Sequence, residues 1–219
     1  KLFRVSQMKE HNLAKDLENE VVKKIAGLAP SLDGILVGDF VYGVITPGII
    51  EALEKISQEN NIPLFGDLQC STQIGNVTKF RDYQLLCPTE REARIALNNQ
   101  EDSVEYVANL LMEYARSSNL IIKLGGNGFI AYGREEGTEF LHRQHFPALT
   151  TNPVDVAGAG DSLLAAVSVG LTKGLTLMEA SALGCCIAAL AVQTVGNIPV
   201  GYQEVKTFVE EREIRTDAV

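Results

Sequence analysis

The sequence predicts a single α/β domain, residues 1–219, in which a mostly parallel sheet carries helices on both faces. Short apolar segments alternate with amphipathic helical patterns through the first half of the chain, which is the order that parallel strands and crossover helices require. One segment, residues 120–125, has the nearly continuous apolar character of a strand covered on both sides. With 46% apolar residues among 219, the chain can bury one large core.

The first predicted helix covers residues 9–28, because apolar side chains recur there at steps of four and three and so form one face. That face consists of Leu13, Leu17, Val21, Ile25 and Leu28. A second helix begins after Thr46, a favourable N-cap residue, with Pro47 at its first position. Strands of apolar character are expected around these helices at 34–40, 62–68 and 84–88.

Thr89 and Glu92 stand at the spacing of a capping box and predict a helix through residue 97. The remaining elements are a helix at 103–116, a hairpin of strands at 120–125 and 128–133, an edge strand at 138–146, and helices at 161–173, 177–192 and 202–212. Since ligands bind outside the carboxyl ends of parallel strands, the functional side chains should lie in the loops that follow strands.

The overall charge narrows the classes of partner. A net charge of −9 and a pI near 4.9 argue against a mainly electrostatic role on nucleic acid or on an anionic membrane. No apolar run approaches the roughly 18 residues that span a bilayer. Four cysteines form no C-x-x-C pair, which favours reduced thiols and a cytoplasmic location. We therefore expect a small-molecule substrate, without nucleic acid or membrane as partner.

The segment VDVAGAGDSLLAA, residues 154–166, carries the most specific signal in the chain. Gly158, Ala159 and Gly160 leave the backbone open at a helix start, where unpaired N–H groups and the helix dipole attract an anion such as phosphate. Asp161, at the same end, can accept the proton of an attacking alcohol, as phosphoryl transfer requires. The alternative is purely structural, because glycine turns also permit tight strand–helix packing and aspartate is a good N-cap.

The longer context favours the catalytic interpretation. Residues 155–162, DVAGAGDS, resemble the D-T-x-G-A-G-D-[ST] signature of the ribokinase-like (PfkB) carbohydrate kinases. The segments IIKLGGNGF and LLCPTEREARIAL resemble that family's L-G-x-x-G turn and its N-x-x-E segment, and the similarity covers nearly the whole chain in the right order. The segments at 34–46 and 62–93 are most similar to the heptose-7-phosphate kinase branch.

The resemblance implies an ATP-dependent kinase for a hydroxyl of a sugar or sugar phosphate, with Asp161 as the base that contacts substrate and residues 158–160 as the anion hole. It implies Mg2+ organised by Glu92, and a monovalent cation, commonly K+, held by Asp155 with the backbone near residues 193–196.

The resemblance also implies contacts with the nucleotide, and one further contact with the substrate. Asp39 would contact the substrate, although an Asx-type turn explains that residue as well. For the small residues at 184–189, simple helix packing is an equally good explanation. Lys123 is a charged residue inside an apolar strand, and we expect its side chain to point to the nucleotide or to solvent at the strand end. The other nucleotide-binding residues that we expect are Gly125, Gly126, Gly128, Cys185 and Ala188.

Three departures from the family pattern leave a second function open. Thr89 stands where the family has the asparagine of N-x-x-E, and Gln69 and the segment GDFVYG each lack a lysine that the heptose kinase branch carries. Each missing charge should weaken binding of an anionic ligand by about 1.5–3 kcal/mol if buried. The substrate is then less anionic than heptose 7-phosphate or the activity is reduced, and the alternative function is a nucleotide-binding or regulatory module without sugar-kinase activity.

The chain begins at Lys1, and the family has earlier strands and a small β lid before the matching point. We therefore expect either a fragment of a longer kinase or a shortened member. The sheet edge left exposed in this way predicts a homodimer or a partner chain that covers it.

Overall fold

The computed structural model describes residues 11–69, 76–134, 141–150, 152–196 and 198–216, and in them it contains one six-stranded sheet. The strands lie side by side in chain order, the first four parallel and the last two antiparallel. They are β1 (Ile35–Asp39), β2 (Leu64–Leu68), β3 (Leu85–Leu86), β4 (Asn119–Lys123), β5 (Phe129–Arg134) and β6 (Leu141–Phe146). The mostly parallel sheet and the β4–β5 hairpin predicted from the sequence are confirmed.

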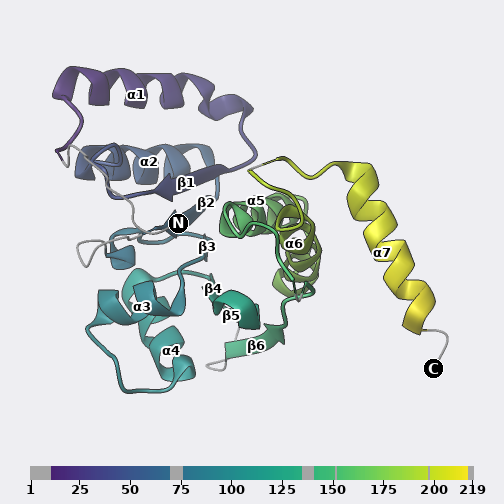
Figure 1. The fold of residues 1–219 in the computed structure, drawn as a ribbon. Helices are drawn as coiled ribbons and strands as arrows, with labels where there is room; N and C mark the ends of the chain where they lie inside the picture. The colour runs from purple at the N-terminus through teal and green to yellow at the C-terminus, as the bar shows by residue number, and fades with distance from the viewer. Residues whose placement is uncertain (1–10, 70–75, 135–140, 151, 197, 217–219) are drawn as a thin grey trace, which may run out of the picture.

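Helices cover both faces of this sheet, as predicted (Figure 1). One face carries α1 (Lys15–Leu28), α2 (Pro47–Asn60), α3 (Glu90–Leu97) and α4 (Val104–Ala115). The other face carries α5 (Ala159–Thr172) and α6 (Leu177–Ala191), and α7 (Tyr202–Thr216) packs against α6 away from the sheet. Short 3-10 turns lie at Ala29–Ser31, Val77–Lys79 and Gly125–Asn127.

Strand β2 shows how the alternation of side chains builds two cores. Leu64 and Leu68 point into the cluster formed with α2 and α4, whereas Phe65 points into the cluster formed with α5 and α6. Every residue of this strand is buried, including Asp67. A charged residue inside a strand covered on both faces needs a partner, and its position near the carboxyl end marks it as a candidate for function.

Helices α5 and α6 pack closely because glycines lie at their contact. A Cβ atom on Gly184 would stand 2.8 Å from side-chain atoms of both Leu163 and Val167. A Cβ atom on Gly170 would stand 2.9 Å from that of Ala180. The glycine at 184 therefore serves helix packing, which is the structural alternative considered above, and the packing fixes α5 against the sheet.

The predicted apolar face of α1 is only partly correct. Leu17 and Leu28 are 46% and 51% exposed, although Leu13, Val21 and Ile25 do pack against the core. The buried residue of α1 is Glu18 instead.

Glu18 is buried because its carboxylate reaches the N-terminus of α2. It accepts a 2.6 Å hydrogen bond from Thr46 Oγ1 and pairs with Lys15. It lies so close to Gly48 that a Cβ there would stand 2.5 Å from Glu18 Oε1. A polar contact between residues 28 positions apart has decided which face of α1 turns inward, and hydrophobic periodicity carries no information about it.

We expect Glu18 to make stability sensitive to acid. The hydrogen bonds from Lys15 and Thr46 lower the pKa of Glu18 from its usual value of 4.5. A folded-state pKa below the unfolded one gives stability that is present above the unfolded value and is lost as pH falls through the folded value. The stability deficit of Glu18→Gln should therefore be seen near pH 7 and should shrink below about pH 4.

Urea unfolding of both proteins at neutral and at acid pH measures this change. Glu59→Gln is the matched control, because Glu59 is exposed and forms only an i,i+4 pair with Lys55. A deficit for Glu18→Gln that stays constant across the pH range would contradict the assignment.

The first strand lies at an edge of the described sheet. Of the described strands, β1 pairs only with β2, and the side chains of Leu36 and Phe40 near it are about half exposed. The expectation that another chain covers this edge stays a prediction. None of the helices in the described ranges combines the length and apolar character needed to cross a bilayer.

Candidate active site

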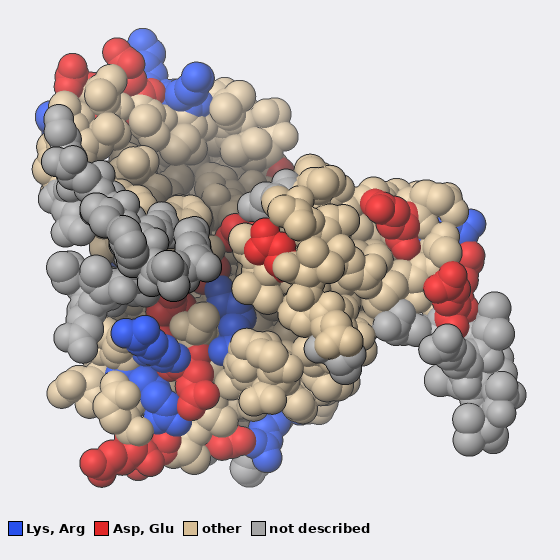
Figure 2. Space-filling view, viewed as in Figure 1, with Lys and Arg blue, Asp and Glu red and all other residues tan. Residues whose placement is uncertain are grey.

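Four charged side chains, three of them predicted as functional from the sequence, lie where the carboxyl ends of the parallel strands face the start of α5. Asp39 is the last residue of β1, and Lys123 is the last residue of β4. Asp67 in β2 pairs with Gly38, the residue before Asp39. Asp161 lies in the first turn of α5. Figure 2 shows acidic and basic side chains side by side in the hollow next to the α5–α6 pair. The sheet edge expected from topology is therefore where these charges gather.

The start of α5 offers unpaired backbone donors. Gly158 is the N-cap residue, with a left-handed φ of 78° that favours glycine. Ser162 N–H donates to the carbonyl of Gly158, but no described acceptor bonds the N–H of Gly160 or of Asp161. These two amides are the orphan donors of a 14-residue helix. Together with the helix dipole they suit an anion.

Position 160 leaves little room for a side chain. A Cβ atom there would stand 3.2 Å from Lys123 Nζ and 3.9 Å from Asp67 Oδ2. The helix start therefore rests directly on the side chains of these two residues. A Cβ at position 160 would displace the Lys123 ammonium by a few tenths of an ångström.

Asp67 and Lys123 form a buried ion pair under that helix start. Lys123 Nζ lies 2.6 Å from Asp67 Oδ2, and the two side chains are 13% and 1% exposed. Burial raises the pKa of Asp67 against the opposing effect of Lys123. Burial disfavours the Lys123 ammonium, but the negative charges around it, that of its partner Asp67 among them, outweigh burial, so the pKa of Lys123 is raised.

Lys123 makes a contact that the sequence did not indicate. Its side chain is directed to Asp67, because a buried carboxylate needs a counter-charge, and it is mostly buried and not in solvent. Its contact with a nucleotide stays a prediction. The other oxygen of that carboxylate, Asp67 Oδ1, is buried and has no hydrogen-bond partner among the described residues. A ligand, or a water bound to one, would satisfy it.

Asp39 is matched by a second lysine. Lys79, from the 3-10 turn after β2, pairs with Asp39, whose other oxygen accepts a 2.8 Å bond from the N–H of Val41. That Asx-type bond is the structural alternative weighed for Asp39, and it is present. The sequence motifs at 38–43 and 67–69 lack lysines, yet both of their aspartates carry one from elsewhere in the chain.

Gln69 contacts the proposed base directly, and sequence reasoning missed this. Its side-chain amide donates a 2.8 Å hydrogen bond to Asp161 Oδ1 across 92 positions of sequence. In the sequence, Gln69 is distinguished only as the position where the related motif has a lysine. No local pattern could have indicated the contact, because it depends on how α5 is docked on β2.

Glu92 is buried and forms a capping box with Thr89 at the start of α3. It accepts a 2.8 Å bond from Thr89 N–H, and Thr89 Oγ1 accepts a bond from Glu92 N–H. A bridge between Thr89 and Lys123 fixes this helix start beside the end of β4. The predicted capping box is confirmed, and Thr89 caps the helix in place of an asparagine.

The acidic residues here do not form a metal cage by themselves. Within the described ranges no three His, Cys, Asp or Glu side chains come together as ligands. Glu92 and the unpartnered Asp67 Oδ1 suit a hydrated Mg2+ carried in with a nucleotide, since Mg2+ keeps several of its waters in such sites.

Asp155 ties the motif to the segment that follows α6. It accepts a 3.0 Å bond from Ala157 N–H and a 3.2 Å bond from Gly196 N–H. These two backbone bonds lower the pKa of Asp155. The N–H groups of Val154 and Asp155 both donate to the carbonyl of Val192. The two segments that the sequence assigned to one cation site are therefore neighbours.

The expected nucleotide contacts fall into two groups. Gly125 and Gly126 are exposed, and a Cβ on either would meet no atom within 4 Å. Cys185 is buried with its thiol donating to the carbonyl of Pro147 at 3.3 Å, and Ala188 is half-buried against the same core. Contact of these residues with a nucleotide stays a prediction.

Gly128 has a structural role whatever it contacts. Its φ is 83°, and a Cβ atom there would stand 2.0 Å from the carbonyl oxygen of Phe146. The turn between β4 and β5 therefore passes directly over β6.

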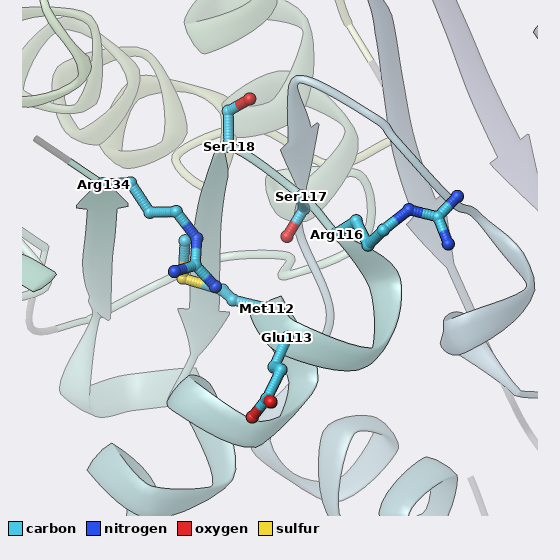
Figure 3. Close-up of a pocket in the computed structure, with 6 residues that line it drawn as sticks. All are labelled: Met112, Glu113, Arg116, Ser117, Ser118 and Arg134. Atoms are coloured by element: carbon cyan, nitrogen blue, oxygen red, sulfur yellow. The ribbon is translucent and has the colours of Figure 1, made fainter. Parts of the chain in front are cut away.

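A separate surface hollow lies at the opposite end of β4 (Figure 3). It has a volume of about 280 Å³ and is lined by Met112, Glu113, Arg116, Ser117, Ser118 and Arg134. The guanidinium of Arg116 points away from the hollow and pairs with Asp82. Its place beside the amino end of β4 separates it from the charged residues around Asp161.

The chain is similar to known proteins over most of its length. Residues 12–201 match the model of the pfkB family carbohydrate kinases. "Bifunctional protein HldE" from Pelobacter propionicus is 28% identical over 208 residues, which are 93% of this chain and 41% of that protein. The protein of the same name from a Campylobacter jejuni strain is 29% identical over 195 residues, 88% of this chain and 40% of its own length. The chain thus spans about two fifths of these relatives.

Solved structures show the same fold at low sequence identity. Phosphofructokinase-2 from Escherichia coli in complex with substrates and products has a TM-score of 0.72 at 15% identity, over 91% of this chain and 63% of that one. Ribokinase from Arabidopsis thaliana complexed with ribose and ATP has a TM-score of 0.71 at 16% identity, over 93% and 61%. The family match over most of the chain and the shared fold lead to one conclusion: this chain belongs to the pfkB family of carbohydrate kinases.

Proposed function

We propose that this chain carries the phosphoryl-transfer site of an ATP-dependent kinase that acts on a hydroxyl of a sugar or sugar phosphate. The observation that carries the proposal is the start of α5, where the unbonded N–H groups of Gly160 and Asp161 stand beside the exposed carboxylate of Asp161. Donors for a transferring phosphate and an acceptor for a proton are the two groups that phosphoryl transfer requires of the protein.

In the proposed reaction, Asp161 accepts the proton of the acceptor hydroxyl, and the oxygen of that hydroxyl forms a bond to the γ-phosphorus of ATP. The bond between that phosphorus and the β–γ bridging oxygen breaks, and ADP leaves with the electron pair. The negative charge of the transferring group lies against the open backbone at Gly158–Gly160, where the unbonded N–H groups of Gly160 and Asp161 receive it. Lys123 and Asp67 support this helix start from below, so the donors are held in place before the substrates arrive.

Magnesium and a monovalent cation complete the proposal. Mg2+ bound with the nucleotide would neutralise phosphate charge, with Glu92 and Asp67 Oδ1 as partners for its waters. Asp155 and the backbone after α6 would hold the monovalent cation. A structure of E. coli phosphofructokinase-2 with potassium supports K+ as the ion to test first.

The nucleotide and the acceptor would approach the same end of α5. The open backbone at Gly125 and Gly126 leaves room for the nucleotide beside the end of β4. The acceptor hydroxyl must reach Asp161, and Asp39 lies at the end of neighbouring β1.

The decisive experiment uses the full natural chain that contains residues 1–219. ADP production is measured with ATP, Mg2+ and K+ against a panel of neutral sugars and sugar phosphates, with heptose 7-phosphate among them. Turnover that depends on one acceptor supports the proposal. Binding of ATP by calorimetry without turnover on any acceptor would instead establish the nucleotide-binding module that the departures at Thr89 and Gln69 leave open. A chain that neither binds ATP nor turns it over contradicts both functions.

A further inference from the structure

Gln69 is fixed at both ends in the site. It follows the last residue of β2, and its backbone N–H donates a 2.8 Å bond to the carbonyl of Asp39 at the end of β1. Its side-chain Nε2 donates a 2.8 Å bond to Asp161 Oδ1. The residue therefore links the ends of two strands to the proposed base on α5.

Without the hydrogen bond from Gln69, the carboxylate of Asp161 would be free to rotate. Asp161 is exposed, and Gln69 is the only described side chain that bonds it. A carboxylate rotates about χ2 with little hindrance, so a fixed donor on one oxygen decides where the other oxygen points. With Oδ1 occupied by Gln69, Oδ2 remains to accept the proton of a hydroxyl.

We propose that Gln69 is a positioning residue, which orients the carboxylate of Asp161 for proton abstraction from the acceptor. This inference rests on the proposed function. The amide of Gln69 is suited to this role because it donates a hydrogen bond without adding a charge. Asp161 therefore forms no ion pair with it, unlike Asp67 with Lys123.

The expected effect appears in turnover and not in binding. Gln69→Leu keeps most of the side-chain volume but has no donor, and Gln69→Asn keeps the amide on a shorter side chain. Each should lower kcat by about tenfold, which is the order expected for losing one hydrogen bond to a charged group. The Kd of ATP and the KM of the acceptor should stay within about twofold, because Gln69 does not act on ground-state binding.

A double-mutant cycle tests whether Gln69 acts through Asp161. The residual turnover of Asp161→Ala is compared with that of Asp161→Ala combined with Gln69→Leu, and no further loss is expected. Gln58→Leu, on the exposed face of α2, is the matched control and should leave kcat unchanged. Urea unfolding shows that each variant is folded under the assay conditions.

The outcomes separate this inference from the proposed function. If the wild type turns over and Gln69→Leu and Gln69→Asn retain full kcat, the positioning role is wrong and the kinase function stands. Equal losses in the wild-type and Asp161→Ala backgrounds would also overturn it. If the wild type shows no turnover on any acceptor, the proposed function fails and this inference fails with it.

Discussion

Replacing Asp161 with asparagine is expected to lower kcat of the proposed phosphorylation by about 10²- to 10⁴-fold, the usual contribution of a general base. The amide has almost the shape of the carboxylate and can still accept the bond from Gln69 through its oxygen. It cannot take a proton from the attacking hydroxyl. The fall should therefore appear in kcat, while ATP binding measured by calorimetry changes little.

A matched aspartate separates this effect from a general loss of charge. Asp33 is exposed and forms only a surface pair with Lys173, so Asp33→Asn should keep both kcat and stability. Retention of wild-type kcat by Asp161→Asn, measured on the acceptor that the wild type phosphorylates, would show that Asp161 is not the base.

Replacing Gly128 with alanine lowers the free energy of unfolding by more than about 3 kcal/mol, because two separate costs add. The φ of 83° with a ψ of −130° belongs to a region that is accessible essentially to glycine alone. The new Cβ would also stand 2.0 Å from the Phe146 carbonyl oxygen, and backbone atoms of β6 and the residues after it cannot move aside without disturbing the sheet. Chemical denaturation compares the variant with the wild type.

Gly126→Ala, two residues away, is the control for this change. The position is exposed, has no positive φ and has no atom within 4 Å of the new Cβ, so its stability should stay within about 0.5 kcal/mol of the wild type. If alanine at 126 weakens ATP binding while stability is kept, the two glycines of one turn have separate roles. Equal stability of the two variants would contradict the assignment of Gly128.

The sequence predicted the fold well because its evidence is local. Strand and helix positions follow from apolar spacing, and caps such as Thr46 and the pair Thr89–Glu92 depend on residues within one helical turn. The open helix start at residues 158–161 was located in the same way, since glycines and an aspartate adjacent in sequence stay adjacent in space, and its role in anion binding stays a prediction. The apolar face of α1 is the exception, because Leu17 and Leu28 are exposed.

The contacts that could not be predicted all join distant parts of the chain. Gln69 reaches Asp161, Lys79 reaches Asp39, and Glu18 reaches Thr46 only after the helices have docked. Lys123 was recognised as unusual inside an apolar strand, but its partner in β2 could not be identified without the register of the sheet. Long-range polar contacts leave no periodic pattern in a single sequence.

The two strand-end aspartates suggest how such a site can change over evolutionary time. Each motif lacks the lysine that the related branch keeps nearby, yet Lys79 and Lys123 supply a positive charge from other elements. We therefore expect selection to maintain the local sum of charge, which different positions can provide in turn. Across an alignment, a lysine gained at position 42 or 69 should accompany the loss of one at position 79 or 123, so covariation, and not a fixed motif, would identify this site in distant relatives.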